Sequence, residues 1–225
     1  MKNFKLTENT KIHEGIILFQ IECIVDLKHV KKGELGGWIE KESNLDGGAW
    51  VYGDAMVYGD AMVSGGARVY GNAWVYGNAW VYGNARVSGD ARVSGDARVY
   101  GNAMVSGDAT VYGNAWVYWG ARVYGNAMVS GGARVYGDAM VYGDAMVSGD
   151  ATVYGDAWEI SPLQIQGTRH FFNICKKGYL QIGCMSFTFQ YWKDNFETIE
   201  TIQGYTDSQI KEYSLYIDLA IKLYT

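Results

Sequence analysis

Proline and cysteine are scarce in this chain of 225 residues, which contains one proline and three cysteines. Because the 30 glycines come with so little proline, a collagen-like helix is excluded. The three cysteines, Cys23, Cys175 and Cys184, are odd in number and irregularly spaced. We therefore expect reduced thiols rather than disulfides or a metal site, which is typical of a cytoplasmic protein. No stretch reaches the roughly 18 apolar residues of a membrane helix, and the first residues lack the apolar region of a signal peptide, so we expect no membrane association.

An excess of positive charge is absent as well, because the formal net charge is −5. Between Ala49 and Asp156 the chain has six arginines and no lysine, against nine aspartates. This balance argues against binding of nucleic acid, which normally needs a basic surface. Aromatic residues are plentiful, with 18 tyrosines and 8 tryptophans, so the chain is expected to be folded rather than disordered.

One six-residue unit dominates the sequence. The pattern Ala-x-Val-x-Gly-(Asp/Asn) runs in register from Ala49 to Asp156, which makes 18 units without an insertion. Two degenerate units precede it over residues 37–48, and the pattern breaks at Glu159, before Pro162. Self-similarity at a short fixed period is the signature of an architecture that stacks copies of one small element.

The residue types within the unit predict its shape. Alanine and valine stand two positions apart, so both side chains point to one side of a short strand, which we expect to be the interior. Glycine allows a backbone conformation closed to residues with a Cβ, and Asp or Asn is expected to tolerate the left-handed region and to bond its own backbone. Each unit is then one strand and one corner. Three corners close a triangle, so the 18 units give six coils and the degenerate units most of a seventh.

A small residue two places before an aliphatic one, as in Ala55-Met56-Val57, resembles the left-handed β-helices of hexapeptide-repeat proteins. The resemblance implies a left-handed, triangular parallel β-helix of about six to seven coils. Together with an N-terminal β cap and a small C-terminal α+β domain, which the residues of the two ends predict, this makes the fold class all-β. A right-handed triangular helix, similar to that of bactofilin-like filament proteins, is the alternative.

Outward residues 18 positions apart should form columns, because every third unit lies on the same face. One face combines a tyrosine column with a column of alternating tryptophan and arginine: Tyr82, Tyr100, Tyr118, Tyr136 and Tyr154 beside Trp80, Arg98, Trp116 and Arg134. Such ladders can stabilise the coil by about 0.5–1.5 kcal/mol per contact. Large exposed aromatic surfaces are also typical of interfaces. We predict that the five tyrosines with Trp80 and Trp116 form the interface of a homo-oligomer, a trimer or a dimer; stabilisation alone is the alternative.

The two ends differ from the repeat. We expect the N-terminal β cap over residues 1–36, the repeat over 37–158 and the α+β domain over 159–225. The sequence Gly-Glu-Leu-Gly-Gly-Trp-Ile-Glu-Lys-Glu-Ser-Asn-Leu at 33–45 resembles the lead-in of uncharacterised bacterial and phage hexapeptide-repeat proteins. In the last part, residues 163–166 and 179–184 look like strands, residues 189–199 have helical spacing, and Thr206 to Gln209 form a capping box before a second helix.

Acyl transfer deserves a test, because many left-handed β-helix proteins are acyltransferases. Those enzymes use a histidine as general base and commonly interrupt the coils with a loop that binds the acyl donor. Here the three histidines, His13, His29 and His170, all lie outside the regular repeat, which has no interrupting loop. We therefore expect no catalytic residue, no cofactor and no metal, and we expect His13 and His29 to be solvated. An acyltransferase whose base comes from the ends is an alternative.

The C-terminal part contains the candidate ligand site. It resembles a phage-type module with the motifs Gly167-Thr-Arg-His170 and Ile182-Gly-Cys184, followed by a tryptophan-bearing helix. Arg169 and His170, with Tyr179, Cys184 and Trp192, offer a cation, a polar ring and a stacking surface, which suits a small anionic nucleotide. A packed core tryptophan and cysteine with a surface arginine is the alternative reading.

The sequence favours a non-enzymatic binding protein of phage type. The resemblance suggests an anti-defence protein in the cytoplasm of the host cell, which sequesters a small nucleotide signal or blocks a host protein. A structural spacer or self-assembling β-helix is the second hypothesis, and the acyltransferase is the third.

Overall fold

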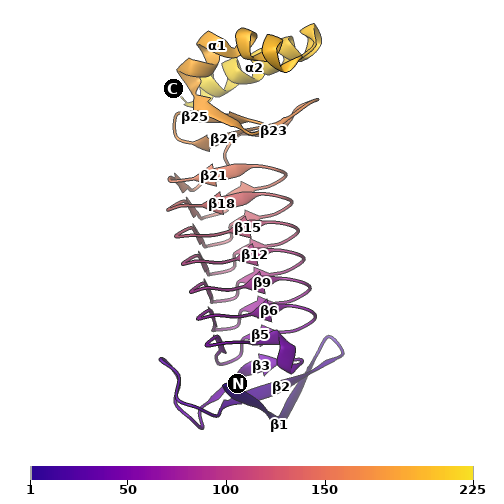
Figure 1. The fold of residues 1–225 in the computed structure, drawn as a ribbon, viewed down its shortest axis with the longest axis vertical. Coiled ribbons are helices and arrows are strands. Elements are labelled where there is room, and N and C mark those ends of the chain that lie inside the picture. Colours follow the sequence, from indigo (N-terminus) through magenta and orange to yellow (C-terminus); the bar gives the residue numbers. More distant parts are fainter. Residues whose placement is uncertain (1, 225) are drawn as a thin grey trace.

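The computed structural model describes residues 2–224 and shows a long stack of coils between an N-terminal hairpin and a C-terminal sheet and helix pair (Figure 1). Two antiparallel strands begin the chain, and a third strand and a short 3-10 helix lead into the coils: β1 (Phe4–His13), β2 (Ile16–Cys23), β3 (Leu35–Ile39) and η1 (Glu42–Asn44). Within residues 2–224, no helix is long and apolar enough to cross a membrane.

The coils form three parallel sheets, because each strand pairs with the strands 18 residues before and after it. Sheet A contains β1, β2, β3, β5 (Met56–Val57), β8 (Trp74–Val75), β11 (Arg92–Val93), β14 (Thr110–Val111), β17 (Met128–Val129) and β20 (Met146–Val147). Sheet B contains β4 (Trp50–Val51), β7 (Arg68–Val69), β10 (Arg86–Val87), β13 (Met104–Val105), β16 (Arg122–Val123), β19 (Met140–Val141) and β22 (Ala157–Trp158). Sheet C contains β6 (Met62–Val63), β9 (Trp80–Val81), β12 (Arg98–Val99), β15 (Trp116–Val117), β18 (Arg134–Tyr136) and β21 (Thr152–Tyr154).

The core follows the predicted pattern. The alanines and valines of the repeat are buried along the whole stack, at 0–2% exposure. The residues between them face outwards, and those 18 apart lie side by side in neighbouring strands, as Arg86 does between Arg68 and Met104. A parallel β-solenoid of about seven turns is therefore confirmed.

The corners differ from the prediction in one respect. Glycine takes the left-handed conformation, with φ +57 for Gly53 and +71 for Gly71, but the following Asp or Asn does not. Instead, asparagine side chains bond to the next coil: Asn72 Nδ2 donates to Asp90 Oδ1 at 2.9 Å, and Asn126 repeats this with Asp144. Glycine alone supplies the strained conformation because it has no Cβ, and this leaves the amide free to bridge coils.

The N-terminal strands cover the first coil. Strand β3 pairs with β5, and the hairpin of β1 and β2 then extends sheet A beyond the repeat. Leu18 of β2 is fully buried in a cluster with Met56 and Tyr58, two outward residues of the repeat that the hairpin hides from solvent. The first coil is thus closed without exposing its edge.

In the last strand of sheet B, the pairing is shifted by one residue relative to the 18-residue period. In β22, Trp158 rather than Glu159 lies opposite Val141, so the pairing slips by one residue and the wide indole fills an inward position. A four-stranded antiparallel sheet follows: β23 (Gln164–Gln166), β24 (Phe171–Lys176), β25 (Tyr179–Ile182) and β26 (Met185–Thr188). The indole and this sheet cover the last coil.

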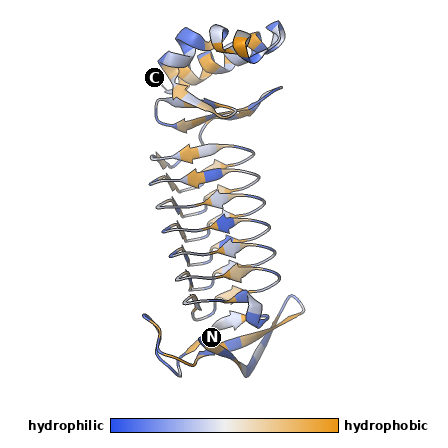
Figure 2. Ribbon diagram, in the orientation of Figure 1, coloured by the Kyte–Doolittle hydropathy of each residue, from blue (hydrophilic) through white to orange (hydrophobic). Residues whose placement is uncertain are grey.

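Two helices complete the chain, α1 (Phe189–Gln203) and α2 (Asp207–Tyr224). The predicted capping box is confirmed, because Thr206 N donates to Gln209 Oε1 and Gln209 N donates to Thr206 Oγ1. Helix α2 buries Tyr213, Ile217 and Ala220 on one face. Polar and apolar residues alternate along both helices (Figure 2), which is typical of helices packed on one side only.

Candidate functional site

The tyrosine column of sheet C forms a continuous stack. Tyr82 and Tyr100 have ring centroids 4.8 Å apart and rings inclined by 1°, and the stack continues through Tyr118 and Tyr136 to Tyr154. The period of the coil brings these rings to stacking distance, so the predicted ladder is confirmed. Burial raises the pKa of Tyr100 and of Tyr118, which keeps both phenols neutral.

Beside the tyrosines, arginine and tryptophan alternate as predicted. The guanidinium of Arg98 lies 5.5 Å from the ring of Trp80 and 5.1 Å from that of Trp116, and Arg134 lies 5.5 Å from the other side of Trp116. These are cation–π distances. The two columns stabilise the coil, and they leave Trp80 46% exposed. We call the outward side of β9, β12, β15 and β18, with its tyrosines, the aromatic face.

One corner of this face departs from the repeat. Trp119 stands where the other units have glycine, and it adopts φ +59, a left-handed conformation that costs a residue with a Cβ about 1–2 kcal/mol. Its indole is 60% exposed, and it contacts Tyr118 and Tyr136 edge-on. Trp119 is thus both strained and exposed, at the border of an aromatic surface.

The predicted C-terminal ligand residues serve mainly as structure. Arg169 donates from its guanidinium to the carbonyl oxygens of Gln203 and Gly204 at the end of α1, and it stacks on Tyr205 at 4.4 Å. His170 lies beside it, near Gly183 and Tyr205. Arg169 therefore satisfies the carbonyls of a helix end, and its fork is already occupied.

The remaining members of that group are separated. Trp192 is fully buried, with its Nε1 donating to Leu180 O at 2.8 Å, so it has no exposed face for stacking on a ligand. Tyr179 begins β25, and Cys184 lies in the turn that follows its other end. His170 lies next to Gly183, whereas Trp192 lies in the core, so the five predicted residues do not surround one common site.

Of the two N-terminal histidines that we expected to be solvated, His29 is exposed, as predicted, whereas His13 is partly buried. His13 packs against Trp74, with ring centroids 4.6 Å apart, and against Tyr58 at 5.5 Å. His29 is exposed, but it lines a cleft on sheet B. Three adjoining hollows make up this cleft, and the sequence did not predict it.

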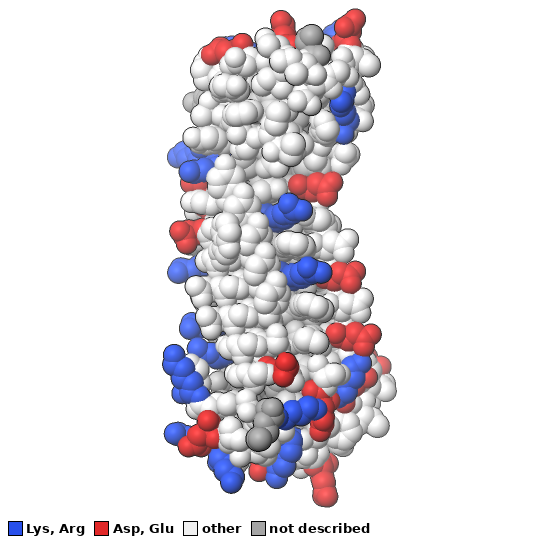
Figure 3. Space-filling view, viewed as in Figure 1, with Lys and Arg blue, Asp and Glu red and all other residues white. Residues whose placement is uncertain are grey.

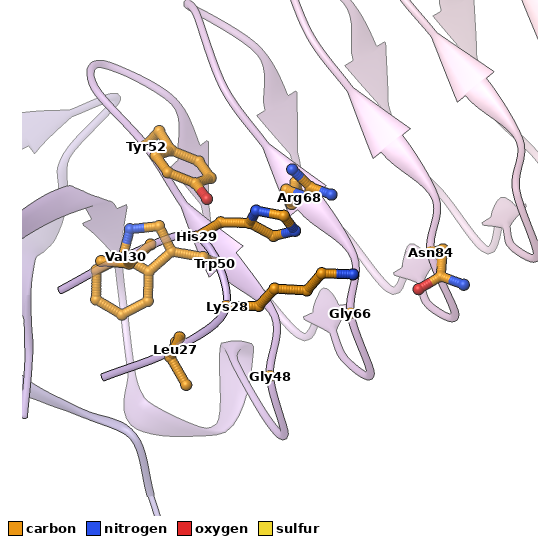
Figure 4. A pocket seen from close by; sticks show the side chains of 10 residues that line it. All are labelled: Leu27, Lys28, His29, Val30, Gly48, Trp50, Tyr52, Gly66, Arg68 and Asn84. Atoms are coloured by element: carbon orange, nitrogen blue, oxygen red, sulfur yellow. The ribbon is translucent and has the colours of Figure 1, made fainter. Parts of the chain in front are cut away.

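A tight turn builds one wall of the cleft. Leu27 N donates to Val30 O at 2.8 Å, and the two residues form an antiparallel bridge. Val30 is 3% exposed and Leu27 packs on the core, so both anchor the turn on the solenoid. The two residues between them, Lys28 and His29, are thereby held over sheet B (Figure 4).

The opposite wall comes from the repeat. Three adjoining hollows, of about 230, 430 and 380 Å³, share Arg68, and Arg86 lines two of them. Tyr52 and Tyr70 supply ring surface, and the buried indole of Trp50 lies beneath. In Figure 4, His29 and the hydroxyl of Tyr52 point to the same side of the cleft as Arg68. The two larger hollows, of about 430 and 380 Å³, are in the range of small-molecule sites.

The charges in the cleft have one sign. Loss of solvent, followed by the charges of Arg68, Lys28 and Arg86, lowers the pKa of His29. No arginine takes part in the ion pairs found within residues 2–224. The corner residues beside the cleft are uncharged: Gly48, Gly66, Asn84 and Asn102. In later coils the same corner position is acidic, as Asp138 and Asp156.

A signal for this site was present in the sequence. Arg68 and Arg86 are direct neighbours in one column of sheet B, whereas the other repeat arginines have uncharged neighbours on both sides in their columns. Like charges directly opposite each other in a sheet are unfavourable. The sequence could not predict that the turn belongs to this site, because Lys28 and His29 lie far from both arginines in the sequence.

Three parallel sheets wound from one short repeated unit define a β-solenoid repeat protein. The comparison with protein families agrees: residues 49–65, 67–118 and 121–160 match, in overlapping windows, the model described as the YdcK beta solenoid repeat. The match is interrupted at residues 119–120, where Trp119 replaces the corner glycine. No curated protein matches the chain.

Proposed function

We propose that the protein binds a small organic phosphate in the sheet B cleft and catalyses no reaction on it. The observation that carries this proposal is the adjacent pair Arg68 and Arg86, which lies below Lys28 and forms no ion pair with the carboxylates that the structure describes. Four cationic or titratable side chains gathered around one concave surface repel one another until an anion binds. Repulsion between these side chains destabilises the protein locally when no ligand is bound, and such local destabilisation is typical of binding sites.

The chemistry of the cleft favours phosphate over a plain carboxylate. Two guanidinium groups and an ammonium group offer several donors, which suit the oxygens of a phosphoryl group. Asn84 adds a neutral donor, and the rings of Tyr52 and Tyr70 provide a flat surface for the organic part. A nucleotide, the predicted ligand class, combines both features.

Calorimetric titration with pyrophosphate, ADP and ATP tests this proposal. We expect binding that weakens with salt, because the contacts are ionic. In Arg68→Gln and Arg86→Gln, we expect the affinity to fall by roughly 10–100-fold, the loss of one charge-assisted hydrogen bond of about 1.5–3 kcal/mol. Without ligand, either substitution should leave the thermal midpoint unchanged or raise it, because it removes repulsion.

The matched control is Arg122→Gln, which changes an arginine of the same sheet B column outside the cleft. It should bind the phosphates as the parent protein does. Absence of binding by the parent protein, or equal losses in Arg122→Gln and Arg68→Gln, would contradict the site.

We also propose that the solenoid is left-handed and triangular and belongs with hexapeptide-repeat folds. The support is the alanine two places before each valine and the division of every 18 residues among three sheets. A crystal structure with a right-handed coil would overturn this. A phage anti-defence role remains a prediction, and the cleft supports only its ligand-binding part.

A further inference from the structure

The aromatic face carries apolar and cationic groups without acidic partners. Trp80 and Trp119 are 46% and 60% exposed, and neither Arg98 nor Arg134 takes part in an ion pair found within residues 2–224. Figure 3 shows an uncharged strip along the stack, with isolated basic groups on it and acidic groups along its border. Such a surface is unusual for a monomer.

The order of residues in the central column is self-complementary. Read along the solenoid it is Trp80, Arg98, Trp116, Arg134, and read backwards it is Arg134, Trp116, Arg98, Trp80. If two copies lie face to face in opposite directions, with the two-fold axis between β12 and β15, each tryptophan meets an arginine. A parallel pair of copies would instead bring residues of the same height together, arginine near arginine.

The irregular corner obeys the same symmetry. Trp119 belongs to the coil of Trp116, and the coil of Arg98 has Gly101 at the equivalent corner. In the antiparallel arrangement, Trp119 of each copy lies opposite Gly101 of the other copy. The projection on one copy therefore meets a recess on the other.

The flanking corners add no repulsion. In the same arrangement Asp138 lies opposite Asn84, and Asn102 lies opposite Gly120. On the other border Asp96 lies opposite Asn114. None of these pairs joins two like charges, which are the usual obstacle to self-association.

We propose that a second copy of this chain occupies the aromatic face, in an antiparallel two-fold dimer centred between β12 and β15. Each Arg98 then lies over Trp116 of the partner as well as next to its own tryptophans. Four strands spaced by about 4.8 Å give columns of roughly 15–20 Å. Because the columns are short, we expect a contact no larger than the standard interface of about 800 Å² per partner and a weak dimer of roughly micromolar affinity.

A residue exchange tests the column order by sedimentation equilibrium of the full chain. Trp116→Arg puts an arginine opposite Arg98 of the partner, and we expect it to weaken the dimer by about tenfold or more. The double variant Arg98→Trp/Trp116→Arg keeps an arginine opposite every tryptophan and should restore the affinity to within about threefold of the parent protein. Thermal unfolding of each variant separates loss of the dimer from loss of the fold.

Cross-linking tests the direction. In a Cys184→Ser background, which removes the exposed thiol, Trp80→Cys and Arg134→Cys are prepared separately and then mixed under oxidation. The antiparallel dimer gives the mixed disulfide in preference to either self-linked product, whereas a parallel dimer gives only the self-linked products. A monomer at about 200 μM, a trimer, or a double variant as weak as Trp116→Arg would each overturn the proposal.

Discussion

At the scale of single residues, the glycine and the Asp or Asn of each corner have different roles from those we expected. Glycine was correctly predicted to take the left-handed corner, but the following Asp or Asn was wrongly expected to share it. The physical reason is that one left-handed residue per corner turns the chain, so the side chain after it remains available for Asn72 to bridge to Asp90. A bond between coils joins residues 18 apart, and local propensity carries no information about it.

Trp119 is the residue at which local preference and structure conflict most openly. The left-handed backbone costs roughly 1–2 kcal/mol, while its two edge-on contacts with tyrosines contribute about 0.5–1.5 kcal/mol each. The two contributions nearly cancel. In Trp119→Gly, we therefore expect the free energy of unfolding of the monomer to change by less than about 1 kcal/mol.

The dimer should respond far more strongly, with a loss of affinity of about tenfold or more when the indole is removed. Chemical denaturation at low concentration measures the monomer, and sedimentation measures the dimer. Tyr112→Gly serves as the control, because this exposed aromatic residue follows β14 on sheet A, away from the aromatic face. A large loss of monomer stability without a change in association would show that Trp119 acts within its own chain.

At the scale of elements, side-chain carboxamides complete the ends of the stack. Asn44 Nδ2 donates to Gly59 O and Ala61 O, and at the other end Asn173 Nδ2 donates to Thr152 O at 2.7 Å. Gln164 does the same for β20, accepting from Ser148 N and donating to Met146 O. The amide side chain imitates the peptide group that the missing coil would have supplied.

Asn173→Leu removes this substitute at the last strand of sheet C. Asn173 is 1% exposed, so Thr152 N and O would be left buried without their partner. We expect the free energy of unfolding to fall by about 2–4 kcal/mol, because each unsatisfied buried polar group costs about 1–3 kcal/mol. Chemical denaturation measures the loss, and Asn114→Leu at an exposed corner should cost less than about 0.5 kcal/mol.

At the scale of the whole molecule, periodicity predicted the stack and its columns, but not the site. Strands 18 residues apart must pair once the coil closes, so the tyrosine and Trp–Arg columns could be foreseen. The cleft needed the turn at Lys28 and His29 to fold back over Arg68. The C-terminal group failed for the opposite reason: proximity in the sequence was taken for proximity in space, while Trp192 turns into the core.

The cleft should also make ligand binding depend on pH. Loss of solvent and the charges of Arg68, Lys28 and Arg86 lower the pKa of His29 in the free protein. A bound anion offsets those charges and raises the pKa of His29, so binding takes up a proton. Affinity should therefore rise as the pH falls through the interval between the free and bound pKa values, and His29 should contribute no pH dependence above both.

Titration of pyrophosphate between about pH 8 and pH 5.5 measures this effect, which one pKa unit of difference would make about tenfold. Because the phosphate itself gains protons over this range, the informative quantity is the difference between the parent protein and His29→Gln. We expect the parent protein alone to gain affinity at low pH relative to the variant, with proton uptake visible in buffers of different ionisation enthalpy. Parallel pH profiles for the two proteins would show that the imidazole does not face the bound anion, and would confine the site to Lys28, Arg68 and Arg86.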